Sequence, residues 1–288
     1  MSESVAELSG KMGVSGKVDV FSLPTVNVGR VSFACASMDE VVSGIVDAIA
    51  SGRGGVVVTP NLDIVRQATF HGESMGILQR ADVRTADGMA IVWASRLKGT
   101  PLPERVAGSD LTLELCRALA GRSARVALIG GDEGVAERAA RRLVGRFPGL
   151  NIVGTCCPPV GFEAMPDEMA ALRRRIWEWN PALVFVAMGF PKQERLIEAL
   201  RAERPDAWWI GIGITLSFIS GDIKRAPVTW RRSGLEWFWR FTQEPRRLGR
   251  RYFIDGVPFG VRLLGGSLAQ RLRGGFRPAR RPPPSAVE

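Results

Sequence analysis

The sequence is poor in the residues that build metal and disulfide centres. Its 288 residues include one histidine, His71, and four cysteines that show no C-x-x-C spacing. Zinc sites and disulfide frameworks need several such side chains at short, regular spacings, so neither is expected here. No D-x-D carboxylate pair occurs either, and carboxylates are the side chains that most often hold a divalent cation. We therefore expect no metal site and no cofactor.

Long apolar runs are also missing. The longest, Leu183–Phe190 and Trp208–Ile219, are shorter than the roughly 18 to 20 residues that a membrane-spanning helix needs. The first twenty residues lack the apolar segment of a secretory signal. Together with the few cysteines, this composition predicts a protein of the reducing cytoplasm that is soluble or peripheral on a membrane.

Positive charge is concentrated in the last quarter of the chain. Residues 224–281 contain 15 Lys and Arg against three Asp and Glu, a local net charge of +12, whereas the whole chain carries +10. The remaining residues, 24 basic against 26 acidic, therefore carry a net charge of −2. This asymmetry indicates a nearly neutral domain followed by a segment that attracts polyanions.

The pattern between residues 26 and 221 predicts an α/β fold. Short apolar or β-branched stretches alternate with helical patterns of about 10 to 15 residues, which is typical of βαβ units and a parallel sheet. We expect a Rossmann-like, mostly parallel sheet with helices on both faces. The strands are expected at 18–20 or 26–31, within 56–61 and 81–88, and at 125–129, 152–155, 183–188 and 208–212.

Four segments follow from these patterns. Residues 1–25 are expected to form a flexible tail, 26–221 a catalytic domain, and 222–264 a basic, aromatic and mainly helical appendage. Residues 265–288 are rich in Gly, Arg and Pro and are expected to be disordered.

Polar residues follow two of the expected strands where each runs into a helix. Thr59 and Asn61 lie in the corner after Val56–Val58, and Asp87 precedes Gly88 after the next strand. Ligands bind outside the carboxyl ends of parallel strands, so these three side chains should face one crevice. Asp87 could there act as a general base towards a hydroxyl group. Equally, all three residues could simply cap the helices that follow them.

Cationic residues suggest where an anion could bind. Pro191 is placed for the first turn of a helix, whose free N–H groups attract anions, and Lys192 or Gln193 could assist there. A plain turn between strand and helix is the alternative. Arg105 and Arg225 are further candidates for a phosphate, or else ordinary surface charges.

The segment Trp230–Phe241 combines tryptophans, phenylalanines and arginines. Aromatic rings beside basic residues suit a helix at the surface of an anionic membrane. Nucleic acid is the rival polyanion, because arginines and stacking rings also bind it, but the concentration of rings in one short segment favours the membrane. The expected membrane residues are Trp237, Trp239, Arg240, Arg246, Arg247 and Arg250.

Taken in order, several blocks resemble the WecG/TagA/CpsF family of bacterial glycosyltransferases. They cover roughly residues 26–259, and seven blocks in the right order are very specific. The blocks are Thr59–Asn61, Ala81–Gly88, Val92–Gly99, Pro101–Asp110, Met188–Glu194, Gly221–Pro227 and Gly234–Arg247.

The resemblance implies an inverting enzyme on the cytoplasmic face of the cell membrane. Such an enzyme transfers a sugar from a UDP-sugar to a polyprenyl-diphosphate-linked saccharide during synthesis of a surface polysaccharide or exopolysaccharide. By resemblance Asp87 looks like the general base, and the polar groups around it would be Thr59, Asn61, Arg105 and Gln193. The arginines expected to reach the diphosphate are Arg225 and Arg231 or Arg232.

One departure from the family pattern concerns the sugar. Ser217 stands where the family often has an acidic residue in a Phe-Asp-Phe sequence, so the transferred sugar is left open. The sequence also leaves room for a homo-oligomer. The rival class is a non-enzymatic protein that binds nucleic acid or membrane through a basic arm on a nucleotide-binding fold; the favoured interpretation has no nucleic acid partner.

Overall fold

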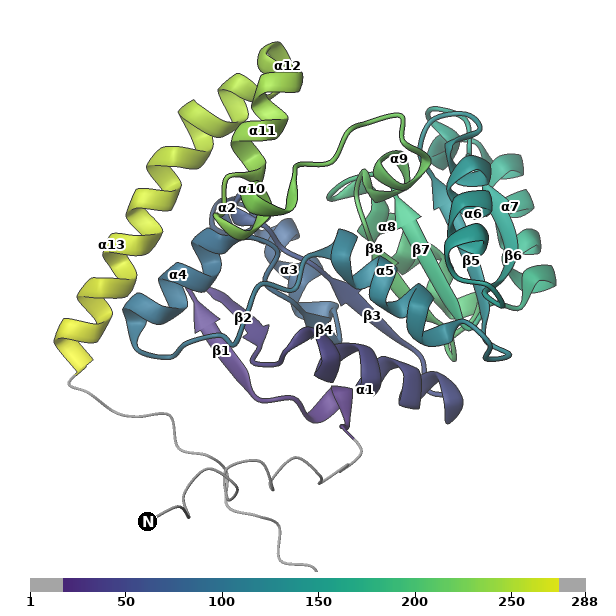
Figure 1. Cartoon of the computed structure of the whole chain (residues 1–288), viewed down its shortest axis with the longest axis horizontal. Helices are drawn as coiled ribbons and strands as arrows, with labels where there is room; N and C mark the ends of the chain where they lie inside the picture. The colour runs from purple at the N-terminus through teal and green to yellow at the C-terminus, as the bar shows by residue number, and fades with distance from the viewer. Residues whose placement is uncertain (1–17, 275–288) are drawn as a thin grey trace, which may run out of the picture.

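A six-stranded parallel sheet forms the centre of the computed structural model, which describes residues 18–274 (Figure 1). The strand order is β4-β3-β8-β7-β5-β6, and every pairing is parallel. This confirms the predicted α/β fold. The strands are β3 (Gly55–Val58), β4 (Val83–Arg84), β5 (Arg125–Gly130), β6 (Asn151–Cys156), β7 (Leu183–Ala187) and β8 (Trp208–Gly211).

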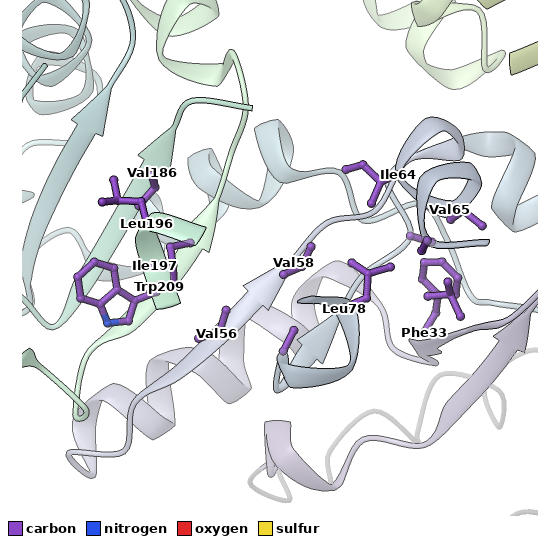
Figure 2. Packing of buried hydrophobic residues seen from close by; sticks show 14 of the residues in the cluster. Phe33, Val56, Val58, Ile64, Val65, Leu78, Val186, Leu196, Ile197 and Trp209 are labelled. Atoms are coloured by element: carbon purple, nitrogen blue, oxygen red, sulfur yellow. The ribbon is translucent and has the colours of Figure 1, made fainter. Parts of the chain in front are cut away.

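Helices cover both faces of the sheet. Because the central strands are buried on both sides, their sequences are continuous apolar runs. Successive residues alternate between two cores: Val56 and Val58 belong to one, and Val57 to the other. Figure 2 shows the first core, where β3 and β7 meet side chains from helices and from Phe33. The helices are α1 (Met38–Ala50), α2 (Leu62–Phe70), α3 (Gly72–Arg80), α4 (Met89–Lys98), α5 (Gly108–Leu119), α6 (Val135–Arg146), α7 (Pro166–Trp179), α8 (Lys192–Leu200) and α9 (Thr215–Ser220).

The N-terminal part differs from the prediction. The strand expected at 26–31 is an antiparallel hairpin of β1 (Thr25–Val28) and β2 (Val31–Ala34). Gly29 takes a left-handed φ of 60°, which glycine adopts without steric cost, so the chain turns there. The 3-10 turn Val20–Ser22 packs with Val20 buried. Residues 20–25 are therefore ordered, contrary to the expected flexible tail, whose residues 1–17 lie outside the described part.

The basic appendage folds back along the α/β part of the chain (Figure 1). Its last helix packs against α4, and Phe259 and Leu263 are buried in the first core. That helix continues to Gly274, so residues 265–274 are helical, contrary to the expected disorder; residues 275–288 lie outside the described part. The appendage elements are α10 (Val228–Arg232), α11 (Glu236–Gln243), α12 (Pro245–Gly249), a π-helical segment (Arg250–Gly256) and α13 (Val257–Gly274).

The β1–β2 hairpin and α13, far apart in the sequence, lie together beside α4. Both β1 and α13 contact α4, and a Cβ placed on Gly29 would lie 3.1 Å from Leu263 Cδ1. The hairpin and the last helix therefore complete one core together. Within residues 18–274, no helix is both long enough and apolar enough to cross a membrane.

Candidate active site

A cleft of about 990 Å³ opens at the carboxyl ends of the strands. Loops after β3, β4, β5, β7 and β8 form one wall, and the appendage forms the other through α11, the π-helical segment and α13. Thr59, Asn61 and Asp87 all line this cleft. The predicted location of these three residues is thus confirmed, and their catalytic roles remain predictions.

The corner after β3 places Thr59 and Asn61. Asn61 caps α2: its Oδ1 accepts hydrogen bonds from the backbone N–H groups of Asp63 and Ile64, each at 3.1 Å. Thr59 is buried, and its Oγ1 lies so close to Gly108 that a Cβ there would be 2.8 Å away. The capping role considered for Asn61 is therefore present, and the same side chain also borders the cleft.

Asp87 does not cap a helix. The N-cap of α4 is Gly88, where no side-chain cap forms. The Asp87 backbone N–H donates to the carbonyl of Pro60 at 3.1 Å, which ties the ends of β3 and β4 together. The side chain keeps 30% of its surface exposed and lines the cleft, which leaves its carboxylate available to a ligand.

The pKa of Asp87 is raised from 3.8 to about 6. Burial is the main cause, because it penalises the charged form. Arg105 opposes it, Glu236 adds to the rise, a hydrogen bond from the Gly108 N–H lowers the pKa, and Asp110 raises it slightly. A carboxylate with a pKa near 6 is deprotonated at neutral pH and is a stronger base than a surface aspartate, as general-base catalysis requires.

Arg105 is the centre of a charged network beside Asp87. Its Nη2 donates to Asp110 Oδ2 at 2.7 Å, and its Nη1 lies 3.3 Å from Glu236 Oε2. The same Nη1 is 3.7 Å from Asp87 Oδ1. The guanidinium is thus held mainly by Asp110 and Glu236.

Two arginines that follow the sheet join this network. Arg225 Nη2 lies 2.8 Å from Asp110 Oδ1 and donates to Ser109 Oγ at 2.5 Å. Arg231 Nη1 donates to Asp110 Oδ1 at 3.0 Å. One carboxylate, Asp110, therefore gathers three arginines. The predicted alternative Arg232 ends α10, and its side chain lies outside the described part.

Gln193 and Lys192 engage other parts of the protein. Gln193 is buried, and its Oε1 accepts from the N–H groups of Gly189 and Gly213 at 3.1 and 2.9 Å. Its amide thereby braces the loops after β7 and β8. Lys192 pairs with Glu163 at 2.9 Å. Both residues border the cleft, so their substrate contacts remain predictions, and Pro191 stands just before α8 and not in its first turn.

The aromatic rings of the appendage pack largely against one another. Trp237 contacts Phe238, Tyr252 and Phe253 with ring centroids 5.7 to 5.9 Å apart. Trp239 packs edge-on to Trp230 at 5.8 Å. These rings form a small core of the appendage, so the predicted membrane contact of Trp237 and Trp239 is limited to their exposed parts.

The basic residues expected at a membrane lie in different environments in the structure. Arg240 borders the cleft, while Arg246 and Arg250 are exposed. The side chain of Arg247 lies outside the described part. Whether these residues bind a membrane stays a prediction.

Two carboxylates of the network were not predicted as site residues. Asp110 lies in the first turn of α5, which begins at Gly108, and its carboxylate binds arginines. Glu236 lies 131 residues from Arg105 in sequence, so nothing local to it indicates the contact. Ser217 borders the cleft on α9. In residues 18–274 no three His, Cys, Asp or Glu side chains group as metal ligands would.

Comparison with known proteins gives consistent matches. A profile of the glycosyl transferase WecG/TagA/CpsF family matches residues 26–273. A protein of Bacillus spizizenii strain W23 is 29% identical over 229 residues, which are 79% of this chain and 87% of the relative. A protein of Bacillus subtilis strain 168 is 29% identical over 231 residues, 80% and 85% of the two chains. Both relatives are named N-acetylglucosaminyldiphosphoundecaprenol N-acetyl-β-D-mannosaminyltransferase.

Proposed function

Since the chain belongs to the WecG/TagA/CpsF family of glycosyltransferases, we propose that it transfers a sugar from a UDP-sugar to a polyprenyl-diphosphate-linked saccharide. The observation that carries this proposal is the pairing of a raised-pKa carboxylate, Asp87, with a cluster of three arginines in one cleft. Membership of an enzyme family removes the basis of the alternative, a binding protein without activity.

The proposed reaction uses Asp87 as the base. The acceptor hydroxyl oxygen attacks the anomeric carbon, and its proton passes to the Asp87 carboxylate. The bond from that carbon to the β-phosphate oxygen breaks, which inverts the anomeric centre and releases UDP. A base with a pKa near 6 suits this proton transfer at neutral pH.

The arginines supply positive charge for phosphate groups. A guanidinium has five N–H donors, so Arg105, Arg225 and Arg231 retain donors for phosphate oxygens while they bind Asp110 or Glu236. Fixed donors aimed at developing negative charge stabilise a leaving group strongly. The same cluster could hold the diphosphate of the donor or that of the acceptor.

The appendage supports a location at the inner face of the cell membrane. Exposed arginines such as Arg246 and Arg250 would attract anionic headgroups by about 1 kcal/mol each. A polyprenyl carrier is embedded in the membrane, so an enzyme bound at that surface can reach the saccharide attached to it.

The relatives suggest the first substrates to test. Their names specify transfer of N-acetylmannosamine to N-acetylglucosaminyl diphosphoundecaprenol. We propose an N-acetylhexosamine or hexose donor and an acceptor of this lipid-linked class. Because Ser217 lines the cleft where the family often has an acid, the preferred sugar need not be that of the relatives.

A panel of UDP-sugars tests the proposal. The full-length protein is mixed with each donor and an N-acetylglucosaminyl diphosphate polyprenol in anionic vesicles, and UDP release and glycolipid mass are measured. One donor should give acceptor-dependent UDP release and a product heavier by one sugar, and Asp87→Asn should reduce both by about 10²-fold or more. Absence of product with every UDP-sugar, but transfer from another nucleotide sugar, would refute the donor assignment.

A further inference from the structure

Glu236 links the appendage to the centre of the cleft. It is the first residue of α11, keeps 22% of its side chain exposed and borders the cleft that Asp87 lines. Its Oε2 lies 3.3 Å from Arg105 Nη1, and its Oε1 lies 3.7 Å from Arg225 Nε. Glu236 is therefore a carboxylate of the appendage that binds Arg105 of the preceding domain and also lies near Arg225 of the appendage itself.

The Nη1 atom of Arg105 has two carboxylates within reach. Glu236 is the nearer at 3.3 Å, and Asp87 lies at 3.7 Å. The 3.3 Å contact with Glu236 is a hydrogen bond, whereas 3.7 Å is too long for one, so Arg105 makes no direct hydrogen bond to Asp87 in this arrangement. Without Glu236, Asp87 would be the remaining acceptor for this nitrogen among the three carboxylates of the network.

We propose that Glu236 is a positioning residue for the catalytic base: it holds Arg105 away from Asp87, so that docking of the appendage keeps Asp87 free to accept a proton. The proposal rests on the function proposed above. A close ion pair with Arg105 would stabilise the charged carboxylate and make it a weaker base. The appendage thus sets the charge environment of Asp87 through Glu236, in addition to supplying Arg225 and Arg231 to the cleft.

The charges around Asp87 agree with this geometry. Arg105 and Asp110 of the catalytic domain face it together with Glu236 of the appendage. Burial is the largest cause of its raised pKa, Arg105 lowers the pKa, and Glu236 raises it. Removal of the Glu236 charge therefore lowers the pKa of Asp87 in two ways. The repulsion between the two carboxylates is lost, and the attraction between Asp87 and Arg105 increases.

The test compares Glu236→Gln with wild type in the full-length protein. Titration of the Asp87 carboxyl carbon by NMR should give a midpoint near 6 in wild type and a lower midpoint, nearer the ordinary 3.8, in Glu236→Gln. The acid limb of the pH profile of kcat/KM should move down with it. The plateau of kcat should fall about 3- to 10-fold, because a weaker base transfers protons less efficiently.

A matched control removes a Glu–Arg pair elsewhere. Glu198 of α8 forms an exposed ion pair with Arg80, with 2.6 Å between Oε1 and Nε. Glu198→Gln breaks this pair and should leave both the Asp87 midpoint and the acid limb of kcat/KM at their wild-type positions. If Glu236→Gln does not fold, Glu236→Asp, whose carboxylate is one methylene further from Arg105, should show a smaller fall of the midpoint. A wild-type midpoint in the folded Glu236 variant overturns the proposal.

The two readouts separate this inference from the proposed function. If no nucleotide sugar supports transfer but the Asp87 midpoint falls in Glu236→Gln, the proposed function fails and the electrostatic role of Glu236 stands. If transfer proceeds and neither the midpoint nor the acid limb moves, the role of Glu236 is wrong and the proposed function is unaffected.

Discussion

Asp87 shows how a single residue acquires reactivity from its surroundings. It joins the ends of β3 and β4 through its backbone, while its carboxylate borders the cleft. We expect Asp87→Asn to reduce transfer by about 10²-fold or more, because the amide keeps the shape but cannot accept the proton. Binding of UDP, the nucleotide part of the donor, should persist when it is measured by calorimetry. Near-normal turnover in this variant would show that Asp87 is not the base.

The same substitution should also change stability, which serves as a check on folding. An aspartate with a folded-state pKa of about 6 and an ordinary value of 3.8 carries a charge at pH 8 that the folded state disfavours. This penalty disappears as the pH falls through 6 towards 3.8. Asp87→Asn should therefore unfold at a higher temperature than wild type at pH 8, and the difference should shrink at pH 4. A lower melting temperature at pH 8 would show that the carboxylate stabilises the fold.

The pH dependence of the reaction follows from the same group. Transfer should be constant above about pH 7 and fall about tenfold per unit below the Asp87 pKa of about 6, because protonation removes the base. Initial rates measured from pH 5 to 8 at low substrate concentration would reveal this limb. A limb near pH 4 instead would mean that Asp87 titrates as an ordinary aspartate during the reaction.

Arginine side chains let us predict the response to chelators. The chain has no D-x-D pair, and Arg105, Arg225 and Arg231 cluster in the cleft. We expect transfer to persist in EDTA, whereas Arg225→Ala should lower kcat/KM by about 10-fold or more, since one charge-assisted donor to a phosphate is lost. Rates with EDTA and with added magnesium or manganese test this. A strict requirement for either metal would contradict it.

At the scale of helices and strands, sequence patterns worked best where a local signal fixes the element. Helices α1 and α2 begin directly after Ser37 and Asn61, whose side chains cap them, and such capping residues are a local signal. The turn at Gly29 was missed because β-branched residues flank it on both sides. Helix α3 was missed because it contains two glycines and only a weak apolar face, so packing against the first core decides its structure.

Strand ends located one part of the candidate site, whereas Arg105, Arg225 and Arg231 were expected there as cationic candidates or from the family resemblance. Thr59, Asn61 and Asp87 could be placed because parallel strands bring their carboxyl ends together. Asp110 and Glu236 could not, since their partners lie on distant segments, up to 131 residues away for Glu236. Ion pairs of this kind depend on tertiary packing, to which sequence spacing gives no access.

Helix α13 gives a prediction about packing. Leu263 is 7% exposed within the first core, whereas Leu272 on the same helix is 77% exposed. We expect Leu263→Ala to reduce the free energy of unfolding by about 2 to 4 kcal/mol, the usual cost of such a cavity. Leu272→Ala should change it by less than about 0.5 kcal/mol. Equal effects in chemical denaturation would mean that α13 does not pack as described.

At the scale of the whole molecule, the concentration of positive charge in the appendage predicts which side of the protein binds an anionic membrane. Replacing Arg246 and Arg250 with Gln should weaken binding to anionic vesicles about 10-fold or more, since each basic residue contributes about 1 kcal/mol. Replacing the exposed Arg122 and Arg141 of the catalytic domain should not. Sedimentation with phosphatidylglycerol vesicles measures this, and salt should weaken it, as charges are screened beyond about 10 Å at 0.1 M.

Two outcomes would contradict this orientation. Equal losses in the two double variants would mean that the appendage does not face the membrane. Indifference to vesicles, with tight and steeply salt-dependent binding to nucleic acid, would assign the basic segment to a different partner.

The contact between the β1–β2 hairpin and α13 affects how the protein folds during its synthesis. Gly29 and Leu263 lie together in space, but the ribosome makes one near the start of synthesis and the other near its end. Elements made soon afterwards, β4 and α4, contact the hairpin, but the part that α13 covers stays exposed until almost the whole chain has been made. Contacts between such distant segments form late and slow folding. A chaperone that shields this hairpin on the nascent chain should raise the yield of native enzyme.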